Sequence, residues 1–137
     1  MNASATKKYL PLLILLLTLI TGLAACQRGS SSDISDIGLD LTISPDPPAV
    51  GPATIKLNLT NADGEPITGA SIELEGNMSH AGMVPVFSQA TELEAGLYEA
   101  PLQFTMGGDW FILVKVNLPD GRKMERQIDV PGVETQD

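Results

Sequence analysis

Residues 55–64 read Ile-Lys-Leu-Asn-Leu-Thr-Asn-Ala-Asp-Gly. Apolar side chains occupy every second position up to Leu59, and successive side chains of a strand point to opposite faces. One face of this stretch would therefore be buried, and the other would meet water. Asp63 and Gly64 follow, and both tolerate the positive φ of a tight turn. The stretch predicts a half-buried β-strand that ends in a turn, which is typical of an antiparallel sheet.

The same short alternation recurs on both sides of this stretch. Asp120 and Gly121 predict a hairpin turn before the last strand, and Pro101 predicts a strand at a sheet edge or with a bulge. The run that begins at Trp110 is almost continuously apolar at its start, so we expect a central strand covered on both faces. About seven short strands, spaced by about ten residues, predict an all-β antiparallel sandwich with Trp110 packed between its sheets. The other segments with strand character are residues 39–43, 72–74, 97–104, 110–118 and 124–130.

A different pattern occupies the beginning of the chain. Lys7 and Lys8 precede an apolar stretch over residues 10–20, and small residues follow up to Cys26, which is the layout of a secretory signal. The run Leu-Ala-Ala-Cys that ends at Cys26 resembles the lipobox of a bacterial lipoprotein. The resemblance implies that Cys26 becomes the N-terminus and is lipidated on its sulfur. An ordinary signal peptide and an uncleaved anchor helix are the alternatives. Cys26 is the only cysteine, so a disulfide within the chain is excluded.

These patterns divide the chain into four parts. We expect a lipoprotein signal peptide over residues 1–25, a lipidated cysteine and flexible tether over residues 26–38, the sandwich domain over residues 39–131 and a tail over residues 132–137. The tether is rich in Ser, Gly and Asp and shows no apolar period. Twelve such residues have a root-mean-square span of about 20 Å, which would hold the domain just clear of a membrane.

The charge of the chain excludes some classes of partner. After residue 25 there are 17 acidic and six basic side chains. A nucleic-acid-binding protein shows the opposite balance, and an acidic domain is not attracted to an anionic membrane surface. No apolar run after Ala25 approaches the about 20 residues that a transmembrane helix needs. We therefore expect attachment to the cell membrane through the lipid on Cys26, with the domain on the extracytoplasmic side.

The candidate chemistry lies in residues 76–86, which read Gly-Asn-Met-Ser-His-Ala-Gly-Met-Val-Pro-Val. Met78 and His80, the only histidine, would project to the same side of an extended segment. The following glycine would let the chain bend and bring Met83 round. Met106, which precedes two glycines, is a candidate fourth ligand from another strand. Thioethers together with an imidazole favour copper(I), so the segment predicts a partly exposed copper(I) site.

The same residues also have an ordinary structural interpretation. Methionines fill gaps in cores, and a single histidine in a loop is commonly a solvated polar side chain. A closed zinc site needs four nitrogen or sulfur ligands, and no calcium-binding loop motif is present. The histidine has no nucleophile motif near it, and no glycine-rich phosphate loop occurs. We therefore do not expect an enzyme.

Four motifs follow one another along the expected domain. They are Asp-Gly-Glu-Pro-Ile-Thr-Gly-Ala at 63–70, Met-Ser-His-Ala-Gly-Met-Val-Pro at 78–85, Gly-Leu-Tyr-Glu-Ala at 96–100 and Phe-Thr-Met-Gly-Gly-Asp-Trp at 104–110. As a set they resemble the YtkA-like domain, which is related in layout to FixH-type proteins. The resemblance implies an immunoglobulin-like fold and an extracytoplasmic, often lipid-anchored protein that handles copper near respiratory oxidases. Relatives often carry a more His-rich loop, so a single histidine puts copper(II) in more doubt than copper(I).

Part of this motif set has a structural explanation as well. Gly69 would start a tightly packed strand, and residues 107–108 would form the turn into the Trp110 strand. Gly96 and Tyr98 would form a corner in which the tyrosine hydroxyl ties down backbone. Under this interpretation only the Met/His loop is left for function.

Two functions follow from these alternatives. The first is a lipoprotein that binds or delivers copper(I) through Met78, His80, Met83 and Met106, with an extracytoplasmic copper protein or an oxidase subunit as its partner. The second is a metal-free immunoglobulin-like module that binds another envelope protein. Convergence of sulfurs and imidazole on an exposed point would favour the first function. Divergence of these groups, with both Met78 and Met83 buried in the core, would favour the second.

Overall fold

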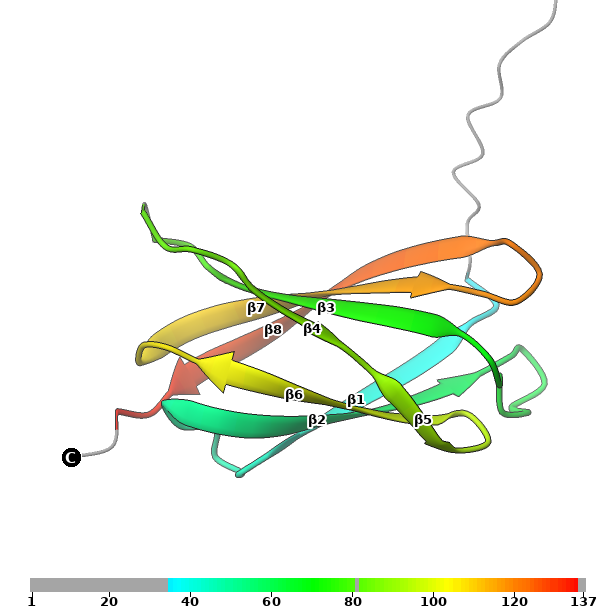
Figure 1. Ribbon diagram of the computed structural model, residues 1–137, viewed down its shortest axis with the longest axis horizontal. Helices are drawn as coiled ribbons and strands as arrows, with labels where there is room; N and C mark the ends of the chain where they lie inside the picture. Colours follow the sequence, from blue (N-terminus) through cyan, green and yellow to red (C-terminus); the bar gives the residue numbers. More distant parts are fainter. Residues whose placement is uncertain (1–34, 81, 136–137) are drawn as a thin grey trace, which may run out of the picture. The chain divides into compact units, whose positions relative to one another are not determined.

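The computed structural model describes residues 35–80 and 82–135, which form two antiparallel sheets of four strands (Figure 1). The predicted signal peptide, Cys26 and most of the predicted tether lie outside the described residues. Within the described part of the chain, no helix is long and apolar enough to cross a membrane. The first sheet has the order β1 (Gly38–Ser44), β2 (Gly51–Thr60), β6 (Leu97–Phe104), β5 (Thr91–Glu94), and the second has the order β4 (Val86–Gln89), β3 (Ser71–Met78), β7 (Gly108–Asn117), β8 (Lys123–Val133).

This strand order is that of an immunoglobulin-like sandwich. In immunoglobulin lettering the first sheet is A-B-E-D and the second is C′-C-F-G, which is the constant-type arrangement with one added strand. The chain passes from one sheet to the other along β4 and β5, with only Ala90 between them (Figure 1). The predicted all-β, immunoglobulin-like fold is therefore confirmed. The sequence pattern does not predict β4 and β5, because each has only four residues.

The core lies between the two sheets. In β2 and β7 every second side chain faces the other sheet and is buried. Trp110 on β7 is 2% exposed, and its ring meets the ring of Phe104 on β6 edge-on, with centroids 5.2 Å apart. The prediction that Trp110 packs between the sheets is confirmed. The largest fully buried side chains are Tyr98, Phe104, Ile55, Leu57, Leu59, Ile72, Leu74, Ile112, Val114 and Val116.

β7 lies between β3 and β8, but only one of its faces is covered. Phe111, Leu113 and Lys115 alternate with the core residues and are half-buried on the outer face. The prediction that this strand is covered on both faces is therefore wrong. A two-layer sandwich has no third layer on that side, so Leu113 lies instead beside its cross-strand neighbour Glu75.

Pro101 lies in β6, which is an inner strand of its sheet. β5 pairs only with residues 97–99 of β6, so at Pro101 the strand is paired with β2 alone. A proline cannot donate to a ladder and is tolerated where one side of its strand is unpaired. The predicted edge position therefore holds locally.

The sandwich extends slightly beyond the expected boundaries. Ile37 is 3% exposed and Gly38 begins β1, so the last two residues of the expected tether belong to the sandwich. The Arg126 side chain donates a hydrogen bond to the Ile37 carbonyl oxygen at 3.2 Å, which fixes this first segment against β8. β8 continues to Val133, two residues past the expected end of the domain.

Tyr98 holds one end of the sandwich together. Its hydroxyl donates to the Ile67 carbonyl oxygen at 2.8 Å and accepts from the Ala70 amide at 3.0 Å. Both partners belong to the loop between β2 and β3, so the side chain ties that loop to β6. Burial raises the pKa of Tyr98 above its ordinary value. The predicted tyrosine tie is confirmed, although it comes from the strand equivalent to E rather than F. We call residues 61–70 and 118–122 the tyrosine end.

Gly96 is required beside this tie. Its φ is +74°, and a Cβ at this position would lie 2.6 Å from the Pro66 Cβ and 2.9 Å from the Leu59 carbonyl oxygen. The Glu92 carboxylate accepts hydrogen bonds from the amides of Gly96 at 3.3 Å and Gly69 at 2.9 Å. The Gly-x-Tyr motif therefore serves the fold.

Candidate metal-binding end of the sandwich

The end opposite the tyrosine end carries the four predicted ligands. We call residues 78–80, 82–85 and 105–107 the Met/His end; they connect β3 to β4 and β6 to β7. Both connections reach the same end because Met78, the last residue of β3, is paired with Trp110 near the start of β7. Figure 1 shows them on the left, away from the β7–β8 turn.

Met78 approaches this end from the core. Its side chain is 7% exposed and belongs to the buried cluster between the sheets. Its methyl carbon lies 3.1 Å from the position that a Cβ at Gly108 would take, so it packs over the first residue of β7. Gly108 has a φ of +123°, which favours glycine, and the missing side chain leaves room for the methionine. Met78 is therefore a core residue at the edge of the candidate site.

His80 and Met83 belong to the connection between β3 and β4. The His80 side chain is exposed, and its carbonyl oxygen accepts a hydrogen bond from the Met83 amide at 3.5 Å. Met83 is half-buried and packs against the core. Val84 beside it is 78% exposed. The loop thus carries one solvated imidazole and one partly accessible thioether.

Met106 lies in the turn between β6 and β7, and its side chain is 48% exposed. Its carbonyl oxygen accepts a hydrogen bond from the indole Nε1 of Trp110 at 2.9 Å. A Cβ at the neighbouring Gly107 would lie 2.6 Å from Cγ2 of Thr135, so the C-terminal segment packs closely against this turn. The turn is therefore held from both sides.

The four predicted ligands share one end of the sandwich but differ in accessibility. His80 and Met106 are exposed, Met83 is half-buried and Met78 is buried. Met78 and Met83 pack with the core, whereas the other two side chains face solvent. In residues 35–80 and 82–135, no group of three or more His, Cys, Asp or Glu side chains is placed to hold a metal ion.

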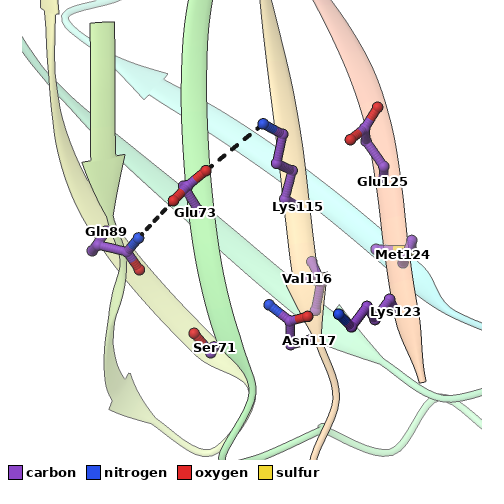
Figure 2. Close-up of a pocket in the computed structure, with 9 residues that line it drawn as sticks. All are labelled: Ser71, Glu73, Gln89, Lys115, Val116, Asn117, Lys123, Met124 and Glu125. Atoms are coloured by element: carbon purple, nitrogen blue, oxygen red, sulfur yellow. Dashed lines mark hydrogen bonds and ion pairs between the residues drawn. The ribbon is translucent and has the colours of Figure 1, made fainter. Parts of the chain in front are cut away.

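A concave surface lies elsewhere, on the outer face of the β4-β3-β7-β8 sheet (Figure 2). There the Lys115 ammonium pairs with Glu75 at 2.5 Å and with Glu73 at 3.7 Å, and Gln89 donates to Glu73 at 3.1 Å. The hydrogen bond between Lys115 and Glu75 raises the pKa of the lysine and lowers the pKa of the glutamate. The lysine and the two glutamates form ion pairs with one another, as is ordinary for charged groups on a protein surface. The surface is lined by Ser71, Glu73, Gln89, Lys115, Val116, Asn117, Lys123, Met124 and Glu125.

Residues 32–115 match the YtkA-like family. The chain belongs to this family. Comparison with curated protein sequences gives no significant match.

Three solved structures resemble the YtkA-like domain in fold. A DUF4426 family protein from Pseudomonas aeruginosa has a TM-score of 0.56 and 10% identity, over 74% of this chain and 94% of its own. The PmoD soluble domain from a Methylocystis species has a TM-score of 0.47 and 15% identity, over 72% of this chain and 90% of its own. Murine CRIg has a TM-score of 0.40 and 11% identity, over 73% of this chain and 99% of its own. At these identities the likeness concerns the fold alone.

The four motifs of this YtkA-like domain divide between its two ends. Residues 63–70 belong to the tyrosine end, and residues 96–100 carry Tyr98, whose hydroxyl ties that end to β6. The motifs 78–85 and 104–110 meet at the Met/His end. The sequence pattern does not assign Trp110 and Gly108 to the Met/His end. Their closeness to Met106 in the run Met-Gly-Gly-Asp-Trp is a signal for it, but only the strand register places them beside Met78.

Proposed function

We propose that this YtkA-like protein is an extracytoplasmic, lipid-anchored protein that binds copper(I) at its Met/His end. One observation carries the proposal: three of the four methionines after Cys26, together with the only histidine, gather at one end of the sandwich. The fourth, Met124, lies in β8 close to the tyrosine end. Thioether sulfur and imidazole nitrogen suit copper(I), whereas calcium prefers oxygen ligands.

The solvent exposure of the four candidate ligands fits a copper(I) site at the protein surface with one ligand at the edge of the core. Met106 and His80 face solvent and would meet the ion first, while Met83 lies between surface and core. Met78 would supply a thioether from the edge of the core. Methionine has three rotatable bonds, so its sulfur can move while the backbone keeps its place. Thioethers carry no proton, so binding to them releases none, unlike binding to thiols.

A lipid on Cys26 would hold the domain by its tyrosine end. Residue 37 joins the sandwich there, where Arg122 pairs with Asp36 at 2.9 Å and Arg126 binds the Ile37 carbonyl oxygen. The Met/His end lies beyond β3, whose eight residues span about 25 Å at about 3.3 Å each. The tether and the copper donors would therefore lie at opposite ends of the sandwich, and the partner would be an extracytoplasmic copper protein or an oxidase subunit.

A metal-free interaction module is the second candidate, and a specific observation favours it. Met78 is 7% exposed, which is ordinary for a core methionine. Val84 and Phe87 are 78% and 61% exposed and form part of the surface next to the Met/His loop. Large exposed apolar patches are typical of protein-binding surfaces, and these two side chains would contribute to such a patch. In this function the methionines only pack the end of the sandwich.

An anaerobic copper(I) titration separates the two candidates. The mature chain with Cys26→Ser is the parent, since the substitution removes the lipid and the only thiol. Competition with a chromophoric copper(I) chelator gives the affinity. We expect one ion per chain and a loss of about tenfold or more when Met78→Leu and Met83→Leu are combined. Met124→Leu is the matched control and should leave the affinity unchanged. If the parent and the double variant bind copper(I) with equal affinity, the proposed copper(I) site is wrong and the metal-free function is favoured.

The anchor is tested separately in cells that produce the full chain. Mass spectrometry of the membrane fraction should find a mature species that begins at Cys26 and carries acyl mass on that residue. Cys26→Ser should leave the precursor without acyl mass on that residue. A mature species without acyl mass on residue 26 would contradict the lipoprotein assignment.

A further inference from the structure

Trp110 links the connection between β3 and β4 to the connection between β6 and β7 at the Met/His end. It is paired with Met78 in the ladder between β3 and β7, and its Nε1 donates to the Met106 carbonyl oxygen at 2.9 Å. The indole is 2% exposed, and the Phe104 ring packs edge-on against it from the other sheet at an interplanar angle of 81°. The ring is therefore held in place by both sheets.

The indole hydrogen bond holds the turn that carries Met106. A buried indole N–H that lost its partner would cost free energy, so the turn keeps this contact. Met106 itself is 48% exposed, so about half of it faces solvent. Its carbonyl oxygen, in contrast, is bound to a rigid core residue. The position of the exposed thioether thus depends on a group inside the core.

We propose that Trp110 is a positioning residue of the copper(I) site, which holds the Met106 turn beside Met78 through its indole N–H. This inference rests on the proposed function. Met78 and Trp110 are paired in the ladder between β3 and β7, and the indole in turn holds the Met106 backbone. The two thioethers are thereby prepared for one ion before it binds, which lowers the ordering cost of binding.

Trp110→Phe tests the inference because it keeps an aromatic ring in the core and removes the N–H. The matched control is Tyr98→Phe, which removes a hydrogen-bonding hydroxyl from the same core at the tyrosine end. Both substitutions are made in the Cys26→Ser chain, and copper(I) affinity is measured beside the thermal midpoint. We expect Trp110→Phe to weaken copper(I) binding about five- to tenfold, the equivalent of one lost hydrogen bond. Tyr98→Phe should lower the thermal midpoint and leave the affinity within about twofold of the parent.

A double-mutant cycle identifies the residue through which Trp110 acts. Met106→Leu should weaken binding in the parent and have a much smaller effect when Trp110→Phe is already present. Additive effects would overturn the inference, as would equal affinity losses in Trp110→Phe and Tyr98→Phe. Full affinity in a folded Trp110→Phe chain would overturn it while leaving the proposed function intact. Absence of copper(I) binding by the parent overturns both.

An NMR measurement keeps the inference testable if Trp110→Phe does not fold. Trp110 is the only tryptophan, so its indole N–H gives a single resonance. This N–H should exchange slowly with solvent in the metal-free chain. Its resonance should shift when copper(I) is added to the parent and stay in place in the Met106→Leu variant. Fast exchange in the metal-free chain, or a resonance that copper(I) does not move, would contradict the assigned role.

Discussion

Met78 and Trp110 are direct partners in the antiparallel register of β3 and β7, and their side chains are 7% and 2% exposed. The end of the sandwich that would present a metal ligand is therefore also part of its hydrophobic core. A substitution at this end changes the free energy of unfolding and the affinity for a ligand together. Each variant consequently needs both measurements.

The first prediction concerns the core. Trp110→Ala removes the ring that contacts Phe104 across the sandwich and should lower the free energy of unfolding by about 3–5 kcal/mol. Urea denaturation of the Cys26→Ser chain measures this loss. Leu93→Ala is the control, because Leu93 is 52% exposed on β5 and its loss should cost within about 0.5 kcal/mol. A loss below about 1 kcal/mol for Trp110→Ala would show that the ring is not central to the core.

The second prediction compares two glycines with similar backbone angles. Gly96 and Gly64 have φ values of +74° and +80°, but only at Gly96 would a Cβ meet other atoms within 4 Å. Gly64→Ala should cost about 1–2 kcal/mol from backbone strain alone. Gly96→Ala adds a collision with Pro66 and should cost about 2–4 kcal/mol in the same urea experiment. Equal losses at the two positions would mean that the contact between Gly96 and Pro66 does not restrict the fold.

The third prediction uses the titration of Tyr98, the only tyrosine after residue 25. Burial raises its pKa in the folded chain, so the phenol keeps its proton to higher pH than in the unfolded chain. Its contribution to stability is therefore present below about pH 10 and is lost as pH rises through the folded-state pKa. Ultraviolet absorbance should show phenolate forming at higher pH in the folded chain than in urea. Coincident titration curves would contradict the buried tie.

Much of the fold could be predicted from local patterns. The strict alternation around Leu57 and the turn at Gly64 lie in the structure where the sequence places them, and Tyr98 makes the expected tie. β4 and β5 could not be predicted, because four-residue strands show too little period and the change of sheet at Ala90 leaves no local signal. The outer face of β7 was also beyond prediction, since apolar residues such as Leu113 do not reveal whether a third layer exists.

The candidate site could be predicted only in part. The pattern of soft ligands identifies four candidate residues, Met78, His80, Met83 and Met106. In the structure all four lie at one end of the sandwich. Burial of Met78 could not be predicted, because it follows from the register that sets Met78 against Trp110. Residue types alone do not determine that register.

The fourth prediction concerns the pH dependence of copper(I) binding. Protons compete with the metal for the imidazole of His80 but not for thioethers. Affinity should therefore fall as the solution becomes more acidic. His80→Ala should weaken binding and flatten this dependence on pH, whereas Met106→Leu should weaken binding at every pH. A His80→Ala curve as steep as that of the parent would remove His80 from the ligand set.

Copper K-edge X-ray absorption of the loaded Cys26→Ser chain tests the central claim most directly. Without the thiol, every sulfur bound to copper must belong to a methionine. We predict a copper(I) edge with two or three sulfur neighbours and one nitrogen neighbour. The sulfur signal should decrease in the Met78→Leu, Met83→Leu double variant and persist in the Met124→Leu control. A first shell of nitrogen and oxygen alone, or a sulfur signal that the double variant leaves unchanged, would contradict a thioether site at the Met/His end.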